Sequence, residues 1–162
     1  MASKGPRKTD GFDLSLTPSH LLRRCTQHAT DLFSQEPGAS DMTKTQFTVL
    51  AAVEEHEGVS QTKLVAMTKI DRSTLAEMMR RMIDKGLLHR ERTETDARAN
   101  AVRITAAGKK ALRAARAANE KVERALLASL SPADRAKLVK LLSAIVNGAD
   151  SAESNGRRRR AR

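Results

Sequence analysis

The chain has 162 residues, and its 30 Lys and Arg residues outnumber its 19 Asp and Glu residues, which gives a formal net charge of +11. This length suits one domain with short extensions, and the charge predicts a polyanionic partner, of which nucleic acid fits best. The sequence has no apolar run long enough to span a membrane and no apolar core of a signal peptide. It has no second cysteine with which to form a disulfide within the chain. It also has no Trp or Tyr on which to stack bases, which argues against a binder of single-stranded nucleic acid.

The N-terminal segment combines a basic arm with the first predicted helix. Residues 1–12 are polar, basic and interrupted by Gly and Pro, so we expect a flexible arm. Within residues 13–38, a helix is predicted from Pro18, with Thr17 as its N-cap, to about Ser34. The residues of its apolar side are Leu21, Leu22, Cys25, Ala29, Leu32 and Phe33.

Two short helices are predicted next. The stretch Thr43–Gln46 has the pattern of a capping box and begins a helix that runs to about His56. Ser60 is the N-cap of another helix, which continues to about Met67. Only residues 68–71 separate this helix from the following one, so the pair predicts a helix-turn-helix.

The helix after Asp71 is apolar on one side and polar on the other. Asp71 is a candidate N-cap, although Thr74 with Glu77 forms a competing capping box. Gly86 ends the helix. Its apolar stripe consists of Leu75, Met78, Met79, Met82 and Ile83. Its opposite face consists of Ser73, Glu77, Arg80 and Arg81, with Thr74 at the edge. Such a face is typical of a solvated surface helix, and also of a helix that reads base edges in a major groove.

Two strand-like runs follow and favour the second interpretation. They are Leu87–Arg92 and Ala101–Ile104, and the polar stretch Thr93–Asn100 between them predicts a loop. The hairpin is basic, with arginines at positions 90, 92, 98 and 103. A basic hairpin after such a helix can follow the phosphate backbone and insert an arginine into a minor groove. Residues 41–104 therefore predict a winged helix-turn-helix domain.

The C-terminal part predicts two helices and a tail. A long helix runs from Thr105 to about Leu130, Ser131–Asp134 begins the last helix, and Asn147–Gly148 ends it. The helices predicted within residues 105–149 have modest apolar stripes. A two-fold dimer that also packs the first helix would bury these stripes best. Residues 150–162 form a predicted disordered, Arg-rich tail. The predicted fold class is mainly α with a small β-wing: a winged helix-turn-helix domain plus a helical dimerisation domain built from the N- and C-terminal helices.

The order and spacing of several short motifs make the chain similar to the MarR family of bacterial transcription regulators, over roughly residues 14–149. The motifs are Ser60–Leu64, Ile70–Thr74, Lys85–Leu88, Asp96–Arg98 and Ile104–Gly108. The resemblance implies a homodimer with interlocked terminal helices, a pseudo-palindromic operator, and commonly repression that a small ligand relieves. The family often has two adjacent arginines at the wing tip, whereas here Ala99 follows Arg98.

The predicted DNA contacts fall on the helix-turn-helix and the wing. Candidates for base edges are Ser73, Thr74, Glu77 and Arg80. Candidates for either bases or phosphates are Arg72 and Arg81, and residues expected to position the phosphate backbone are Gln61, Thr62 and Lys69. In the wing, Arg92 is a further candidate for DNA contact, and the resemblance implies that Arg98 enters the minor groove. Asp96 either holds Arg98 by an ion pair or shapes the hairpin as an Asx-turn residue.

The first helix carries two further candidate sites. His20, Arg24 and His28 are spaced by four residues with Arg23 beside them, which is typical of a solvated or dimer-contacting face. Alternatively, this row binds an anionic effector, such as an aromatic carboxylate or an acyl-coenzyme A thioester. Cys25 suggests either a small apolar filler or a redox sensor, but the cysteine-sensing branch of the family surrounds its thiol with tyrosines, and this sequence has none.

The remaining function classes find little support in the sequence. It has no Gly-rich phosphate loop, nucleophile elbow, paired metal ligands or coherent acid–base set, so we predict neither an enzyme nor a cofactor or metal site. A non-specific, chromatin-like basic protein is an alternative that the net charge favours. The expected partners are double-stranded DNA, a second copy of the chain and a small effector, but no membrane. We expect a cytoplasmic bacterial protein that joins the nucleoid when bound.

Overall fold

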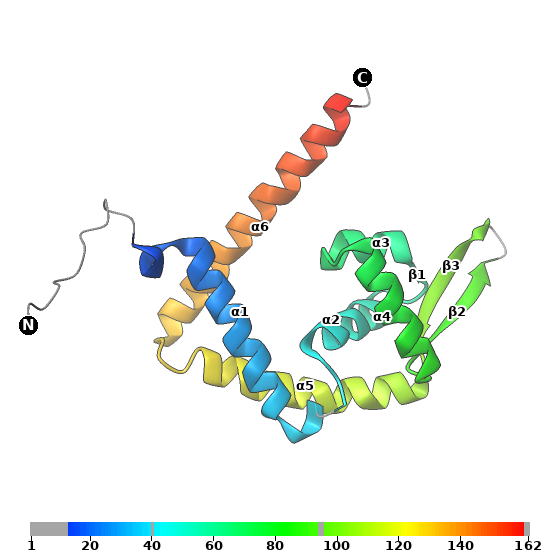
Figure 1. Cartoon of the computed structure of the whole chain (residues 1–162), viewed down its shortest axis with the longest axis horizontal. Coiled ribbons are helices and arrows are strands. Elements are labelled where there is room, and N and C mark those ends of the chain that lie inside the picture. Colours follow the sequence, from blue (N-terminus) through cyan, green and yellow to red (C-terminus); the bar gives the residue numbers. More distant parts are fainter. Residues whose placement is uncertain (1–12, 40, 94–95, 161–162) are drawn as a thin grey trace, which may run out of the picture. The chain divides into compact units, whose positions relative to one another are not determined.

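The computed structural model describes the backbone of residues 13–39, 41–93 and 96–160, and the side chains of these residues except 92–100 and 153–160. The helices are α1 (Pro18–Gln35), α2 (Lys44–Glu55), α3 (Gln61–Thr68), α4 (Arg72–Asp84), α5 (Ala106–Leu126) and α6 (Pro132–Arg160), with 3-10 turns η1 (Leu14–Leu16) and η2 (Pro37–Ala39) (Figure 1). The strands are β1 (Val59–Ser60), β2 (Leu88–Thr93) and β3 (Asp96–Ile104). The predicted fold class, mainly α with a small β-wing, is confirmed. Two compact units lie within Met1–Glu123 and Arg124–Arg162.

Side-chain caps fix the beginnings of α2 and α3 where the sequence predicts them. Thr43 and Gln46 form both hydrogen bonds of a capping box, 3.1 Å from the Gln46 N–H to Thr43 Oγ1 and 2.9 Å from the Thr43 N–H to Gln46 Oε1. Ser60 Oγ accepts a 3.2 Å hydrogen bond from the backbone N–H of Lys63. These bonds satisfy N–H groups that the first turn of a helix leaves without partners, so both predicted helix starts are confirmed.

The turn between α3 and α4 contains a strained residue. Lys69 follows the last residue of α3 with φ +55, in the left-handed region, where a Cβ atom crowds the backbone. We expect Lys69→Gly to be more stable than Lys69→Ala by about 1 kcal/mol, because both substitutions remove the charge but only glycine relieves the crowding. Urea unfolding of the two variants measures the difference. An alanine variant as stable as the glycine variant would show that this turn is unstrained.

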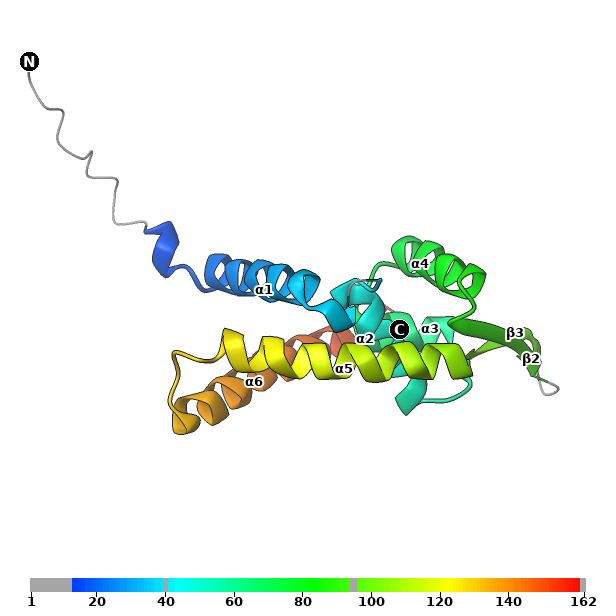
Figure 2. The same ribbon diagram turned by 90° about the horizontal axis from the view of Figure 1, so that it is seen from below.

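The sheet contains one strand that the sequence did not predict and one that is longer than predicted. It is antiparallel with the order β1–β3–β2, and β1 pairs Val59 with Val102. The prediction of a loop at Thr93–Asn100 is wrong for Thr93 and for 96–100, because β2 extends to Thr93 and β3 begins at Asp96 and pairs Asn100 with Arg92. Positions 94 and 95 lie outside the described residues. Backbone ladders do not depend on side-chain polarity, so a polar hairpin arm looks like a loop in the sequence. Both views show the hairpin of β2 and β3 extending beyond α3 and α4 (Figures 1 and 2).

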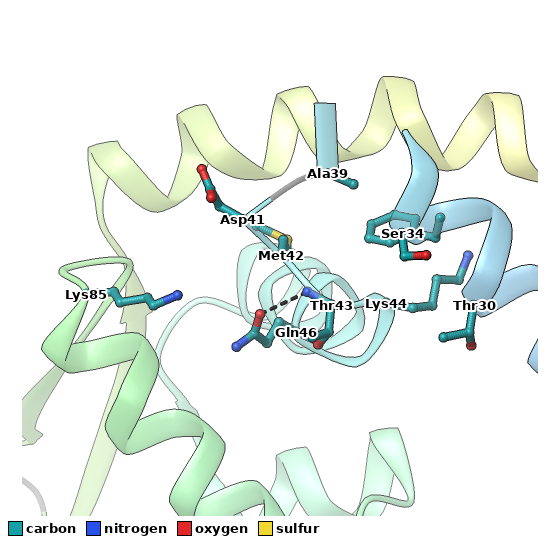
Figure 3. Close-up of a pocket in the computed structure, with 10 residues that line it drawn as sticks. Thr30, Ser34, Ala39, Asp41, Met42, Thr43, Lys44, Gln46 and Lys85 are labelled. Carbon is teal, nitrogen blue, oxygen red and sulfur yellow. Dashed lines mark hydrogen bonds between the residues drawn. The ribbon is translucent and has the colours of Figure 1, made fainter. Parts of the chain in front are cut away.

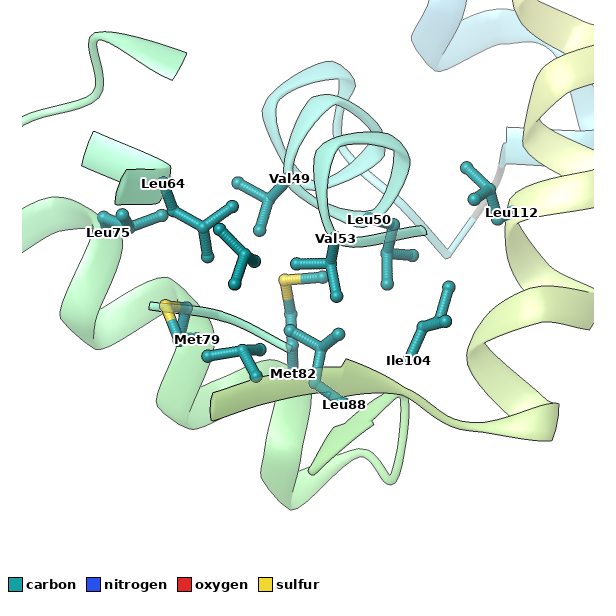
Figure 4. Packing of buried hydrophobic residues seen from close by; sticks show 12 residues of the cluster. Val49, Leu50, Val53, Leu64, Leu75, Met79, Met82, Leu88, Ile104 and Leu112 are labelled. Atoms are coloured by element: carbon teal, nitrogen blue, oxygen red, sulfur yellow. The ribbon is translucent and has the colours of Figure 1, made fainter. Parts of the chain in front are cut away.

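One apolar cluster holds the helix-turn-helix and the wing together. Its largest fully buried side chains from α2, α3 and α4 are Val49, Leu50, Val53, Leu64, Leu75, Met79 and Met82. Strands and α5 add Val59, Leu88, Val102, Ile104 and Leu112. Figure 4 shows these side chains converging from α2, α4, the strands and α5. The buried side of α4 is part of the predicted apolar stripe, so packing fixes which face of α4 remains exposed.

A close approach of two backbones joins the wing to α5. Thr105 Oγ1 donates a 2.6 Å hydrogen bond to the carbonyl oxygen of Gly86, and Thr105 N–H donates one of 3.1 Å to that of Leu87. The same hydroxyl accepts a 2.9 Å hydrogen bond from the N–H of Gly108. Gly108 lies so close to the Leu87 carbonyl group that a Cβ atom would overlap its oxygen. Only glycine leaves room for this contact.

The C-terminal end of α1 packs on α5 through a second, smaller cluster. Its buried residues are Phe33, Ala39, Ala115, Ala118 and Val122. Two ion pairs also join α5 to neighbouring segments. Arg116 pairs with Glu54 of α2 at 2.6 Å, and Lys121 pairs with Glu36, which follows α1, at 3.1 Å. The small side chains of α5 allow this close packing, and the end of α1 is thereby placed beside the beginning of α2.

The N-terminal half of α1 leaves apolar side chains uncovered. Leu21 is 42% exposed, Leu22 is 41% exposed, and Cys25 is also exposed. The expectation that Cys25 fills a core is therefore wrong for a single chain. Within the predicted apolar side, Phe33 is buried, whereas Ala29 and Leu32 are half-buried. One chain therefore buries the C-terminal end of the predicted apolar side but not its N-terminal part.

The last helix, α6, is longer than predicted and carries its own exposed apolar residues. It continues to Arg160, so the predicted end at Asn147–Gly148 and the predicted disorder of residues 150–160 are both wrong. Gly148 is not among the glycines with positive φ, and a glycine ends a helix only when it leaves the helical conformation. Its exposed large apolar residues are Val139, Leu141, Ile145 and Val146. None of the described helices combines the length and hydrophobicity needed to cross a bilayer.

Candidate nucleic-acid interface

The outer face of α4 gathers all six residues that the sequence predicts there. They are Arg72, Ser73, Thr74, Glu77, Arg80 and Arg81, and each is exposed. Because Leu75, Met79 and Met82 are fully buried on the opposite side, this face cannot rotate inward without breaking the core. A rigid helix with an exposed polar face has the form that fits a major groove.

Asp71 both caps α4 and restricts what Ser73 can do. Asp71 Oδ1 accepts hydrogen bonds from the N–H groups of Ser73, at 2.9 Å, and Thr74, at 3.2 Å, and another from the Ser73 hydroxyl. The Ser73 hydroxyl, followed by the N–H groups of Thr74 and Ser73, lowers the pKa of Asp71. These bonds confirm Asp71 as the N-cap. Since the Ser73 proton points to Asp71, the hydroxyl oxygen is left as an acceptor for a donor on a base.

Glu77 lies between two arginines. Arg80 donates to it through Nε, at 3.0 Å, and Nη2, at 2.8 Å, while Arg81 donates through Nε at 2.8 Å. Arg80 Nη1 also donates to Asp84 Oδ2 at 2.8 Å. The hydrogen bonds from Arg80, and then from Arg81, lower the pKa of Glu77 to about 2, so its carboxylate is ionised throughout the neutral range. The sequence identified these residues but did not indicate that they bind one another.

The beginning of α3 lies beside the beginning of α4. Arg72 Nη2 donates a long 3.4 Å hydrogen bond to Thr62 Oγ1, which links two predicted contact residues. Gln61 precedes Thr62 and is half-buried, while Lys69 is exposed in the turn. The ends of two helices and the turn between them thus present polar side chains on one surface, as expected for a helix-turn-helix.

The wing candidates are only partly described. Arg92 lies in β2, and Asp96 and Arg98 lie in β3, but their side chains are outside the described residues, so their predicted roles stay predictions. Arg103 forms ion pairs with Glu91 and with Glu57, the second at 3.7 Å. These pairs neutralise Arg103, so the wing is less basic than its arginine count suggests.

A cavity of about 480 Å³ lies where the end of α1, the beginning of α2 and the end of α4 meet (Figure 3). Its lining residues are Thr30, Phe33, Ser34, Ala39, Asp41, Met42, Thr43, Lys44, Gln46 and Lys85. Figure 3 shows Lys85 reaching from the end of α4 toward the loop that carries Asp41. Lys44 Nζ lies 5.5 Å from the centre of the Phe33 ring and donates to Asn119 and, at 3.3 Å, to Glu123.

The predicted effector row does not line this cavity. His20, Arg23, Arg24 and His28 lie in α1 before Thr30, the first residue that lines the cavity. The sequence did not indicate Lys44 or Lys85 as effector-binding residues, because only the folded chain brings these distant positions together. No group of three His, Cys, Asp or Glu residues in the described part could hold a metal ion.

Comparison with known proteins agrees with this architecture. A model of the MarR family matches residues 40–99. The chain is 34% identical over 128 residues to the transcriptional regulator HosA of Escherichia coli O157:H7, and the match covers 79% of this chain and 93% of that protein. Among solved structures, the PcaV regulator of Streptomyces coelicolor in complex with its natural ligand superimposes with a TM-score of 0.79 at 28% identity, covering 87% of this chain and 99% of PcaV.

A second structure connects the same fold to control by a ligand. Bordetella bronchiseptica BpsR, whose DNA binding is regulated by 6-hydroxynicotinic acid, superimposes with a TM-score of 0.78 at 28% identity, covering 83% of this chain and 96% of BpsR. The identity to HosA extends over nearly the whole of that regulator, and the fold, wing included, agrees. The chain belongs to the MarR family of transcriptional regulators.

Proposed function

We propose that the chain is a homodimeric repressor that binds a pseudo-palindromic operator in double-stranded DNA and is released by a small effector. The observation that carries this proposal is the exposed polar face of α4, which a fully buried apolar side holds in a fixed orientation next to the wing. Side chains on such a face can pair with base edges, while the wing follows the phosphates. Its relatives are regulators and not enzymes, and the site needs no catalytic group.

The exposed apolar residues support a dimer. Leu21 and Leu22 on α1, and Leu141 and Ile145 on α6, are each more than two-fifths exposed in one chain. Burying such residues against a second copy is favourable, and a two-fold axis uses the same surface twice. The dimer would present two copies of α4 to half-sites whose centres lie about 10 base pairs apart. Cys25, on the same part of α1, would then be covered by the partner.

The cavity supports an effector that is small and anionic. Its volume of about 480 Å³ lies within the range of pockets for drug-sized ligands, which favours an aromatic acid over the much larger acyl-coenzyme A thioester. Phe33 and Met42 offer apolar contact, and Lys85 offers positive charge, while the Lys44 ammonium is paired with Glu123. A hydroxylated aromatic acid, the class to which the BpsR ligand belongs, combines both requirements. The row formed by His20, Arg23, Arg24 and His28 stays a prediction.

Competition between specific and random DNA tests the proposed function. A regulator of this class is expected to prefer its own promoter fragment over scrambled DNA by about a thousandfold or more at near-physiological salt. A chromatin-like protein that binds by charge alone would bind both fragments equally.

Peroxide treatment tests the redox alternative. If peroxide released the protein from DNA and Cys25→Ser prevented this release, Cys25 would be identified as a sensor.

Removal of the wing arginine is expected to weaken binding without changing base preference strongly. Arg98→Ala should lower affinity for the operator and reduce the slope of log affinity against log salt by about one, because one phosphate-region contact is lost. Fluorescence anisotropy across a salt series measures both quantities. Lys110→Ala removes the same charge from an exposed position on α5 and is the control. Equal slopes for the Arg98 variant and the unaltered protein would contradict a groove contact.

A further inference from the structure

We propose that Glu77 is a positioning residue that sets the specificity of the interface by holding Arg80 and Arg81 for contact with base edges. The proposal rests on the proposed function, since it concerns how α4 discriminates among DNA sequences. It differs from the sequence-based expectation, in which Glu77 itself contacts a base.

Three of the roughly four acceptor sites of the Glu77 carboxylate are already used within α4. Oε1 accepts from Arg80 Nη2 and from Arg81 Nε, both at 2.8 Å, and Oε2 accepts from Arg80 Nε at 3.0 Å. A glutamate that reads cytosine must accept from the exocyclic amino group of the base. Glu77 has one acceptor site left for such a contact, on Oε2. Turning its carboxylate fully toward a base would give up charge-assisted bonds to arginine, which are stronger than bonds to a neutral amino group.

The two arginines keep the donors that guanine requires. An arginine has five N–H donors in a planar fork. In the described part of the chain, Arg80 uses three of them, two on Glu77 and one on Asp84, and therefore retains two. Among the described residues, Arg81 donates through its Nε–H alone, so both of its terminal nitrogens keep their donors there. A bidentate contact with the O6 and N7 atoms of guanine needs two donors, which either arginine can still supply.

Holding the arginines also changes how well the site discriminates between DNA sequences. Glu77, Asp84 and the two arginines carry two negative and two positive charges, so this part of α4 has no net charge. Free arginines would bind any phosphate, which strengthens binding to every sequence alike. Arginines that are held in place lose less conformational freedom when they meet the correct base, so the specific complex gains relative to the non-specific one.

The test compares Glu77→Gln with Asp84→Asn in the full-length protein. Both variants remove one negative charge from the same face of α4, but Glu77 holds both arginines, whereas Asp84 contacts Arg80 alone. Affinity for a selected operator and for scrambled DNA is measured across a salt series, and unfolding is measured for each variant. Glu77→Gln is expected to bind scrambled DNA at least as tightly as the unaltered protein, while its preference for the operator falls by about tenfold or more. Asp84→Asn should retain most of the preference.

Four results would overturn the proposal. The preference could survive in Glu77→Gln, both variants could lose it equally, or a new preference could arise at a single base pair, which would make Glu77 a direct reader. If the role of Glu77 were purely structural, Glu77→Gln would have a lower melting temperature and would bind operator and scrambled DNA more weakly to the same degree. This fourth result would also overturn the proposal. Failure of the proposed function is a separate outcome, because the unaltered protein would then show no preference between the two DNAs.

Discussion

Replacing Gly108 with alanine is expected to destabilise the winged domain by about 3 kcal/mol or more, the range of severe overpacking. The added Cβ would overlap the carbonyl oxygen of Leu87 and lie 2.8 Å from Ile104 Cγ1. Neither neighbour can move easily. The Leu87 carbonyl accepts a 3.1 Å hydrogen bond from Thr105 N–H, and Ile104 is buried in the main core. Relief of the overlap therefore requires α5 to separate from the wing.

Gly148→Ala is the matched control for this experiment. Gly148 is also helical, but nothing lies within 4 Å of a Cβ placed there, so alanine should stabilise α6 by up to about 1 kcal/mol. Urea unfolding followed by circular dichroism gives both free energies of unfolding. If the two substitutions changed stability equally, the close approach between α5 and the Leu87 carbonyl would not exist in the protein.

Two glutamates on the apolar stripe of α6 are expected to abolish both dimer formation and tight DNA binding. Leu141 is 54% exposed and Ile145 is 59% exposed in one chain, and the proposed dimer buries them. Glutamates at these positions would place charges without partners in that interface. A monomer holds one half-site at a time and loses the gain from simultaneous binding, so affinity for the full operator should fall at least about a hundredfold.

The control for the dimer experiment adds the same charge with the same spacing to exposed polar positions of α6. Ser143→Glu with Asn147→Glu also introduces two negative charges four residues apart, at sites where the native side chains are exposed and polar. Sedimentation should show a dimer for this control and a monomer for Leu141→Glu with Ile145→Glu. A dimer in both cases would mean that α6 does not form the interface through this stripe.

Local sequence signals predicted most helix starts because each depends on residues that are neighbours in the chain. The capping box at Thr43 and the N-caps at Ser60 and Asp71 all form as expected. The errors fall where the outcome depends on something other than local composition. The polar stretch at 96–100 joins β3 through backbone pairing with β2, and Gly148 stays helical instead of ending α6.

The candidate site was predictable in its position but not in its internal bonds. Apolar periodicity identified the outer face of α4, which depends only on which side is buried. The same periodicity could not show that Glu77 holds Arg80 and Arg81, since side chains at such spacings can pair with each other or with a ligand equally well. The cavity was missed because Lys44 and Lys85 come from different helices and meet only through packing.

Selection of bound fragments from a random duplex library, at near-physiological salt and followed by sequencing, tests the central claim most directly. If two copies of α4 read adjacent major grooves, the enriched fragments will share an inverted repeat whose half-site centres lie about 10 base pairs apart. Enrichment of fragments that share no sequence would contradict the claim and leave a protein that binds DNA by charge alone.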